Sequence, residues 1–105
     1  MAGRASHSRP GTRAPHVVLG DNRSTLDLFG SQFAVLRPAG GGVDDWAPPG
    51  ATSHVIDAEG FAEAYGLDAG GATLVRPDGV VAWRSRGPAE RPQITRALAT
   101  ALAQA

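Results

Sequence analysis

Short apolar runs that end in turn residues recur along the first half of the chain. Runs of this kind are typical of strands, because a few apolar or β-branched residues bounded by Gly, Pro, Asn or Asp fit a buried extended segment. The pattern predicts strands at residues 16–19, 33–36 and 53–56. Between the last two, residues 39–52 hold four Gly and two Pro, which predict a loop.

The strongest local pattern predicts a β-hairpin. Residues 72–76 and 80–84 are β-rich runs, and they flank Pro77-Asp78-Gly79. Proline presets the φ of the first corner residue, the Asp side chain closes the turn, and Gly adopts the positive φ that follows. We therefore expect two antiparallel strands joined by this turn.

Two short helices are predicted from capping residues. Ser24 and Asp27 have the spacing of a capping box, and Gly30 is expected to end that helix in the left-handed conformation, just after Phe29. Asp57 is the expected N-cap of a second helix that ends at residue 65. In that second helix, the aromatic residues 61 and 65 are four apart and share a face.

The longest predicted helix covers residues 90–104. Its apolar residues follow the i, i+4, i+7, i+8 spacing of a helix with one buried face. They are Ile94, Leu98, Ala101 and Leu102.

The order of these elements indicates an α/β fold of the thioredoxin-like type. A mixed central sheet with flanking helices accounts for strands separated by helical segments and followed by a hairpin and a helix. The loop at 39–52 means that the first long helix of this plan is shortened or missing. We expect residues 13–105 to form the domain and residues 1–12 to form a flexible N-terminal arm.

Composition excludes several classes of function. The chain has 105 residues, enough for one domain, with ten basic and ten acidic residues. A zero net charge argues against nucleic-acid binding, which needs a basic excess to neutralise phosphates. No apolar run approaches the roughly 20 residues needed to cross a membrane, and the chain start has no secretory-signal core, so we expect a cytoplasmic protein.

No catalytic or metal site is predicted. The chain has no cysteine, which removes thiolate nucleophiles, iron–sulfur clusters and Cys-type zinc sites. His7, His16 and His54 lack the spacing of metal ligands. Ser53, His54 and Asp57 carry the groups of a catalytic triad, but no GxSxG sequence presents the serine as a nucleophile.

The two tryptophans have different expected roles. Trp83 alternates with Val81 along its strand, which predicts a place in the core or on a sheet face. For Trp46, in the predicted loop, two interpretations stay open. It covers the space left by the shortened helix, or it lies at an interface with a partner, where Trp is enriched.

Arg76 and Arg84 lie on opposing strands of the predicted hairpin. We expect each to pair with a nearby acid, such as Asp78 or Glu90, or to face solvent. A contact with a partner is the less favoured alternative.

Three blocks of residues carry a resemblance to a known family. They are residues 11–16 (GTRAPH), 24–30 (STLDLFG) and 71–84 (GATLVRPDGVVAWR). In this order they resemble the C-terminal domain of flavin-dependent aromatic-ring hydroxylases, the monooxygenase group that includes phenol hydroxylase and the polyketide-tailoring hydroxylases. The motif positions that we read as structural are Ser24, Asp27, Phe29, Gly30, Arg76, Pro77, Asp78, Gly79, Trp83 and Arg84.

The resemblance implies a thioredoxin-like domain that follows a large FAD-binding and substrate domain. In that family, hydroxylation uses FAD, NAD(P)H and O₂, and the residues that bind them lie in the large domain. None of those motifs occurs in this chain, so we expect it to bind no cofactor. Ala72, preceded by Gly71, stands where thioredoxins have a cis-proline, and the cysteine pair is missing, so no thiol redox activity is implied.

We therefore expect an accessory domain that is not catalytic alone and acts in assembly, dimerisation or stability. Its expected partner is a second copy or a flavin-bearing hydroxylase chain. One alternative is a part of a split or truncated flavin monooxygenase that hydroxylates aromatic or polyketide substrates. Another is an aromatic ligand-binding module lined by Trp46, Phe33 and Tyr65.

Overall fold

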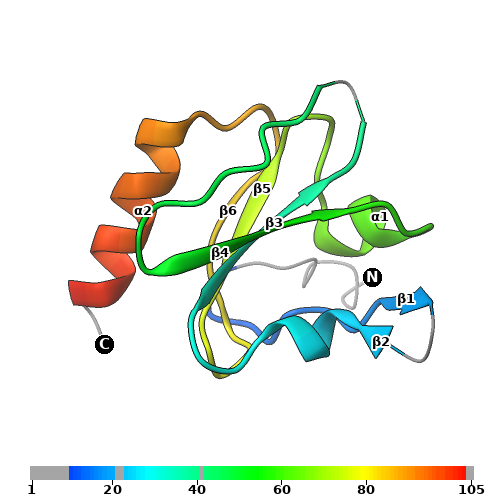
Figure 1. The fold of residues 1–105 in the computed structure, drawn as a ribbon, viewed down its shortest axis with the longest axis horizontal. Helices are drawn as coiled ribbons and strands as arrows, with labels where there is room; N and C mark the ends of the chain where they lie inside the picture. Colours follow the sequence, from blue (N-terminus) through cyan, green and yellow to red (C-terminus); the bar gives the residue numbers. More distant parts are fainter. Residues whose placement is uncertain (1–9, 21–22, 41, 104–105) are drawn as a thin grey trace.

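The computed structural model describes residues 10–20, 23–40 and 42–103, and its centre is a mixed four-stranded sheet (Figure 1). The strand order is β4-β3-β5-β6. β3 (Phe33–Pro38) pairs in parallel with β4 (Ala51–Ile56) and antiparallel with β5 (Ala72–Val75). β5 in turn pairs antiparallel with β6 (Val81–Ser85). The predicted α/β class and mixed sheet are confirmed.

Each face of the sheet carries its own hydrophobic core. Along β3, Phe33 and Val35 belong to one cluster and Ala34 and Leu36 to the other, as the alternation of a strand requires. One cluster includes residues of α2 (Arg91–Ala103), and the other includes residues of α1 (Phe61–Tyr65) and of the N-terminal segment. The two helices accordingly lie on opposite sides of the sheet in Figure 1.

The connection between β3 and β4 contains no helix in its described residues, 39–40 and 42–50. A crossover between parallel strands needs about a dozen residues, and this stretch is just long enough. Trp46 and Ala47 pack against the cluster that includes α2. The loop thus covers part of the sheet face on which the family's first long helix was expected.

The first predicted strand does not join the central sheet. β1 (Val18–Gly20) pairs with β2 (Arg23–Ser24) in a separate two-stranded sheet. Val17 is buried, and its N–H donates a hydrogen bond to the Thr25 hydroxyl at 3.0 Å. The segment is therefore held by side chains beside α1. The predicted strand at 16–19 is confirmed in part, since β1 begins two residues later and pairs outside the central sheet.

The first short helix is a 3-10 helix, η2 (Thr25–Leu28), and its capping box is confirmed. The Ser24 N–H donates to the Asp27 carboxylate at 2.8 Å, and the Ser24 hydroxyl accepts from the Leu26 N–H at 3.2 Å. The predicted positive φ at Gly30 is confirmed, but its value differs from that of a left-handed helical cap. Phe29 ends the helix in an extended conformation, and Gly30 follows it with φ of 156°.

The second short helix is shorter than predicted. It begins at Phe61 after Gly60, whose φ is 85°, so Asp57 is not its N-cap. Gly60 offers no side-chain cap, and its left-handed conformation turns the chain into the helix. The predicted aromatic pair is present, with the ring centroids of Phe61 and Tyr65 4.7 Å apart.

α2 confirms the predicted C-terminal helix over its described residues. Ile94 and Leu98 are buried against the sheet, whereas Leu102 is 53% exposed. Leu102 lies eight residues after Ile94, and this spacing turns the helix about 80° past two full turns. Leu102 therefore points away from the buried face. Of the predicted stripe, Ile94, Leu98 and Ala101 contact the core and only Leu102 does not.

The hairpin is confirmed, with an irregularity that the sequence pattern did not predict. The Gly79 N–H donates to the Arg76 carbonyl at 2.9 Å, and Gly79 has φ of 85°. Trp83 faces Leu74 and Val81 faces Val75, so a bulge at residue 82 shifts the register. Trp83 and Val81 consequently contact opposite cores, which corrects the expected alternation.

Part of the predicted N-terminal arm is bound to the sheet. The Gly11 N–H donates to the Val81 carbonyl and the Val81 N–H donates to the Thr12 carbonyl, both at 2.8 Å. The Ala14 N–H donates to the Gly79 carbonyl, also at 2.8 Å. Residues 10–14 therefore cover the outer edge of the sheet at the start of β6, and the rest of the predicted arm, with His7, lies outside the described residues.

Candidate functional site

The three blocks that carry the family resemblance meet around the hairpin turn. The Gly79 carbonyl accepts from Ala14 of the first block. A Cβ atom on Gly79 would lie 3.8 Å from the Phe29 ring of the second block. Gly79 has a positive φ, which the turn requires, and a Cβ atom there would make ordinary van der Waals contact with Phe29.

Beside this junction, a hydrogen-bond network fixes the first block. The Pro15 carbonyl accepts from the Tyr65 hydroxyl at 2.6 Å and from the Thr25 hydroxyl at 2.8 Å. The Thr25 oxygen in turn accepts from the Val17 N–H. Tyr65 and Thr25 are fully buried, and burial raises the pKa of the Tyr65 phenol to about 12.

The motif residues of the hairpin have structural partners. Arg76 donates to the Asp78 carboxylate at 2.6 Å, and both side chains are about half exposed, so this pair adds little stability. The Asp78 carboxylate also accepts from the Val80 N–H at 3.2 Å, which closes the turn after Pro77. Arg84 is half-buried on β6.

The residues of the hypothetical triad are not assembled. The His54 ring bonds to the Thr52 hydroxyl at 2.8 Å, whereas the Ser53 hydroxyl donates to the Asp45 carboxylate at 2.6 Å. Residues 52 and 54 share one face of β4 and Ser53 points to the other. Burial is the main cause that lowers the pKa of His54, so the neutral ring is favoured.

The described part of the chain contains no group of three or more His, Asp or Glu side chains that would hold a metal ion. It also contains no helix that is long and apolar enough to cross a membrane.

Trp46 belongs to a polar and aromatic contact that joins the β3–β4 loop to α2. The Arg91 guanidinium lies 4.9 Å from the centre of the Trp46 ring. It also donates two hydrogen bonds to the Asp44 carboxylate, at 2.9 and 3.0 Å. These hydrogen bonds lower the pKa of Asp44. Trp46 therefore packs within this chain, against the cluster that includes α2, and its expected role at an interface stays a prediction.

Sequence reasoning missed Arg37, which is 3% exposed at the end of β3. Its guanidinium donates to the carbonyls of Gly70 at 2.9 Å, Ala89 at 2.8 Å and Asp44 at 3.3 Å. One buried cation thus ties together three loops at the same end of the sheet. An arginine beside a proline gives no local signal for this role, because its partners are far away in the sequence.

The proposed aromatic pocket of Trp46, Phe33 and Tyr65 does not form. Phe33 and Trp46 contact the cluster of α2, whereas Tyr65 lies in the cluster of α1. The sheet separates them, and Tyr65 has no exposed surface. The aromatic ligand-binding pocket predicted from the sequence is therefore wrong.

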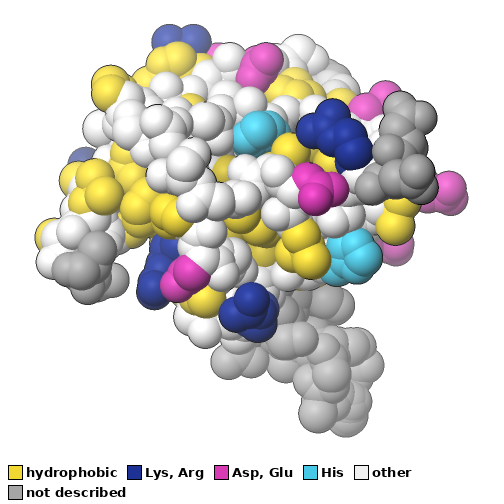
Figure 2. Space-filling model, turned by 60° about the horizontal axis from the view of Figure 1, so that its bottom comes forward, with side chains coloured by type: hydrophobic (Ala, Val, Ile, Leu, Met, Phe, Trp, Pro, Cys, Tyr) yellow, Lys and Arg dark blue, Asp and Glu magenta, His cyan; other side chains and the backbone are white. Residues whose placement is uncertain are grey.

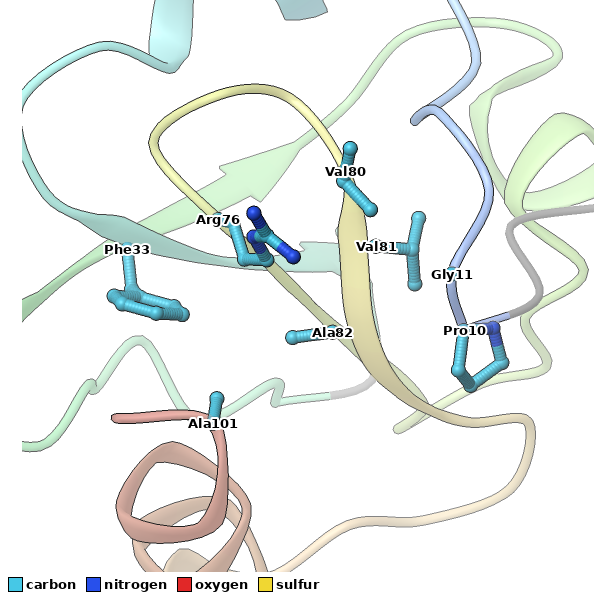
Figure 3. A pocket seen from close by; sticks show the side chains of 8 residues that line it. All are labelled: Pro10, Gly11, Phe33, Arg76, Val80, Val81, Ala82 and Ala101. Atoms are coloured by element: carbon cyan, nitrogen blue, oxygen red, sulfur yellow. The ribbon is translucent and has the colours of Figure 1, made fainter. Parts of the chain in front are cut away.

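Two hollows lie next to each other where β6 and α2 approach the start of the described chain. The first, of about 360 Å³, lies between Val80 to Ala82 of the hairpin, Phe33, Ala101 and Pro10 (Figure 3). The second, of about 500 Å³, lies between β6 and the outer side of α2. Both are lined by Pro10, Ala82 and Ala101.

Comparison with known proteins identifies the family. The family model for the C-terminal region of aromatic-ring hydroxylases matches residues 7–105. The chain belongs to the aromatic-ring hydroxylase C-terminal family. This confirms the resemblance to FAD monooxygenases that include polyketide hydroxylases.

Relatives of this C-terminal domain are much longer proteins. The chain is 44% identical, over 86% of its length, to 4-methyl-5-nitrocatechol 5-monooxygenase of Burkholderia sp. It is 37% identical, over 73% of its length, to aklavinone 12-hydroxylase RdmE of Streptomyces purpurascens. Among solved structures, it matches the flavin-dependent monooxygenase PieE in complex with FAD and substrate with a TM-score of 0.72, 31% identity and 93% coverage. The chain spans only about a fifth of the length of each of these proteins.

Proposed function

We propose that this domain is an accessory module of an FAD-dependent aromatic hydroxylase, not catalytic by itself, which stabilises or assembles the flavin-bearing part. The carrying observation is the family match over residues 7–105 in a chain that spans about a fifth of its relatives. The polar side chains of the three family blocks support the same function, because they bind one another and the backbone of this chain.

The finer assignment of the fold is also a proposal. The first strand of the sheet, β3, lies between a parallel neighbour and an antiparallel one, the closing hairpin is antiparallel, and a helix follows it. This arrangement supports a thioredoxin-like domain that has lost its first long helix. A thiol redox role is not part of the proposal, because the chain has no cysteine.

The residues of this chain fit a flavin poorly, so we place FAD and NAD(P)H in the remaining part of the hydroxylase. A cofactor pyrophosphate commonly binds at the N-terminus of a long helix. At the start of α2, the Asp44 carboxylate is bound to Arg91, and the Gln93 side chain accepts from the Glu90 N–H. A carboxylate at this position repels an anion.

A second candidate is that the domain acts within a single flavin monooxygenase chain that hydroxylates aromatic polyketides. The names of the relatives favour this candidate, since they include a putative polyketide hydroxylase and a tetracenomycin A2 monooxygenase-dioxygenase. In that case, the domain has the same stabilising role in cis, and the substrate contacts lie elsewhere.

One preparation distinguishes these functions. The 105-residue chain is purified, and its visible absorption is recorded before and after incubation with FAD. We expect no flavin absorption to remain after gel filtration, and we expect a flavoprotein to be retained when the tagged chain is isolated from its own cells. A chain that keeps FAD, or that hydroxylates an aromatic substrate with NAD(P)H unaided, contradicts the accessory function.

A further inference from the structure

The two hollows beside β6 form one continuous surface, which we call the β6–α2 groove. They share lining residues in the N-terminal segment, in β6 and in α2, and their volumes are about 360 and 500 Å³. In Figure 2, hydrophobic side chains gather next to the C-terminal end of α2, with an arginine and an acidic side chain beside them.

The lining of this groove is mixed, with apolar, polar and positively charged side chains. Its apolar residues include Phe33, Val80 and Trp83, and its charged residues are Arg76 and Arg96. No acidic residue lines either hollow, although Asp78, the partner of Arg76, lies next to the groove. Aromatic residues and arginines are enriched at protein interfaces and acidic residues are depleted there, so this composition fits an interface.

The position of the groove relates it to the polypeptide that precedes this domain. Pro10 lines both hollows, and residues 11 and 12 are bonded to Val81 at the edge of the groove. The family match begins at residue 7 and concerns the C-terminal region of hydroxylases. In PieE, which was solved with FAD, about four fifths of the chain lies outside the match. Pro10, the first described residue, thus places the N-terminal end of the described domain beside this groove.

We propose that the β6–α2 groove is the surface on which the flavin-bearing part of a hydroxylase docks, an inference that rests on the proposed function. The docking element presents apolar side chains to Trp83 and Ala82 and a carboxylate to Arg96. Docking covers the half-buried edge of β6 beyond Val81, which lies past the hydrogen bonds of residues 11–14.

The test uses a hybrid in which the matching segment of PieE is exchanged for residues 7–105 of this chain. Thr100 lines the groove and is exposed, so Thr100→Trp fills the groove without changing the core. Thr95 is the matched control, because it is an exposed threonine of the same helix and does not line the groove. Five residues separate their directions by about 140° around the helix.

We expect Thr100→Trp to lower the temperature of FAD release from the hybrid, followed by flavin fluorescence, by at least about 5 °C relative to Thr95→Trp. The melting temperature of the isolated 105-residue chain changes equally in both variants. A photo-crosslinking residue at position 100, but not at 95, is expected to give a covalent product with the flavin-bearing segment of the hybrid.

Other outcomes separate the two proposals. A crosslink from position 100 to a second copy of the hybrid, or to residues 7–9 alone, overturns the docking surface, as does an equal effect of the two substitutions on FAD release. If the hybrid without substitutions fails to hold FAD while PieE holds it, the accessory function itself is contradicted.

Discussion

At the scale of single residues, the Pro15 carbonyl has two donors, and they are not equivalent. The Tyr65 hydroxyl donates to this carbonyl, whereas the Thr25 hydroxyl both donates to it and accepts from the buried Val17 N–H. Removing a partner from a buried amide leaves that amide unsatisfied, which costs about 1–3 kcal/mol, whereas a single lost hydrogen bond costs about 1 kcal/mol.

We therefore expect Thr25→Val to lower the free energy of unfolding more than Tyr65→Phe does. Both substitutions keep the shape of the side chain, and after Tyr65→Phe the Pro15 carbonyl still has Thr25 as a donor. Urea denaturation of the two variants measures the difference. A larger loss for Tyr65→Phe contradicts the network as described here.

Tyr65 also predicts how stability depends on alkaline pH. Burial raises its folded-state pKa to about 12, above the ordinary value of 10.0. The unfolded state therefore loses this proton first, and the contribution of Tyr65 to stability is full below pH 10 and is lost as the pH rises from 10 toward 12.

Because Tyr65 is the only tyrosine, its ultraviolet titration is specific to this site. We expect the folded chain to titrate about two pH units later than the chain unfolded in urea. The free energy of unfolding of Tyr65→Phe is expected to vary less between pH 10 and 12. An ordinary midpoint in the folded chain contradicts the burial of this phenol.

At the scale of elements, the entry to β5 depends on the lack of a side chain at Gly71. A Cβ atom there would lie 2.5 Å from the Arg86 carbonyl and 2.8 Å from the Ser85 carbonyl, both backbone atoms at the end of β6. The two chain segments cannot approach this closely if residue 71 carries a methyl group.

Gly71→Ala is accordingly expected to destabilise the domain by about 1–3 kcal/mol, the cost of overpacking. Gly87→Ala is the control, because nothing lies within 4 Å of a Cβ atom at that position and its φ is not positive. Thermal unfolding of both variants gives the comparison. Equal melting temperatures contradict the close approach of β5 to the end of β6.

The elements that local chemistry determines were predicted well from the sequence. The Pro77-Asp78-Gly79 turn, the capping box of Ser24 and the apolar spacing of α2 are each set by residues close together in the chain. The predictions that failed depend on strand pairing and register, which an apolar run does not determine. Val18 pairs with Ser24 instead of the central sheet, and the bulge at residue 82 follows from the pairing of β6 with β5.

The candidate site was predictable in its members but not in its assembly. The family blocks were recognised as structural, yet no local pattern brings Phe29, Ala14 and Gly79 together. No sequence pattern pointed to Arg37. Its guanidinium binds three backbone carbonyls that come together around it only in the folded chain. The loop between β3 and β4 was predicted from its Gly- and Pro-rich sequence, because those residues act locally.

At the scale of the whole molecule, the N-terminal segment connects the edge of the sheet at β6 with α1. It covers the edge of β6 through residues 11–14, and it reaches α1 through the hydrogen bond between Pro15 and Tyr65. The edge of the sheet and the contact with α1 are thus stabilised by the same short segment.

This arrangement predicts the effect of removing the segment. A chain that begins at His16, compared with one that begins at Pro10, lacks three backbone hydrogen bonds to the hairpin, the buried Ala14 side chain and the Pro15 carbonyl. At about 1 kcal/mol for each hydrogen bond, we expect the melting temperature to fall by roughly 10 °C or more. Hydrogen exchange gives the decisive readout. The Val81 amide, which donates to Thr12, is expected to be protected only in the longer chain, and equal protection in both chains contradicts the bound segment.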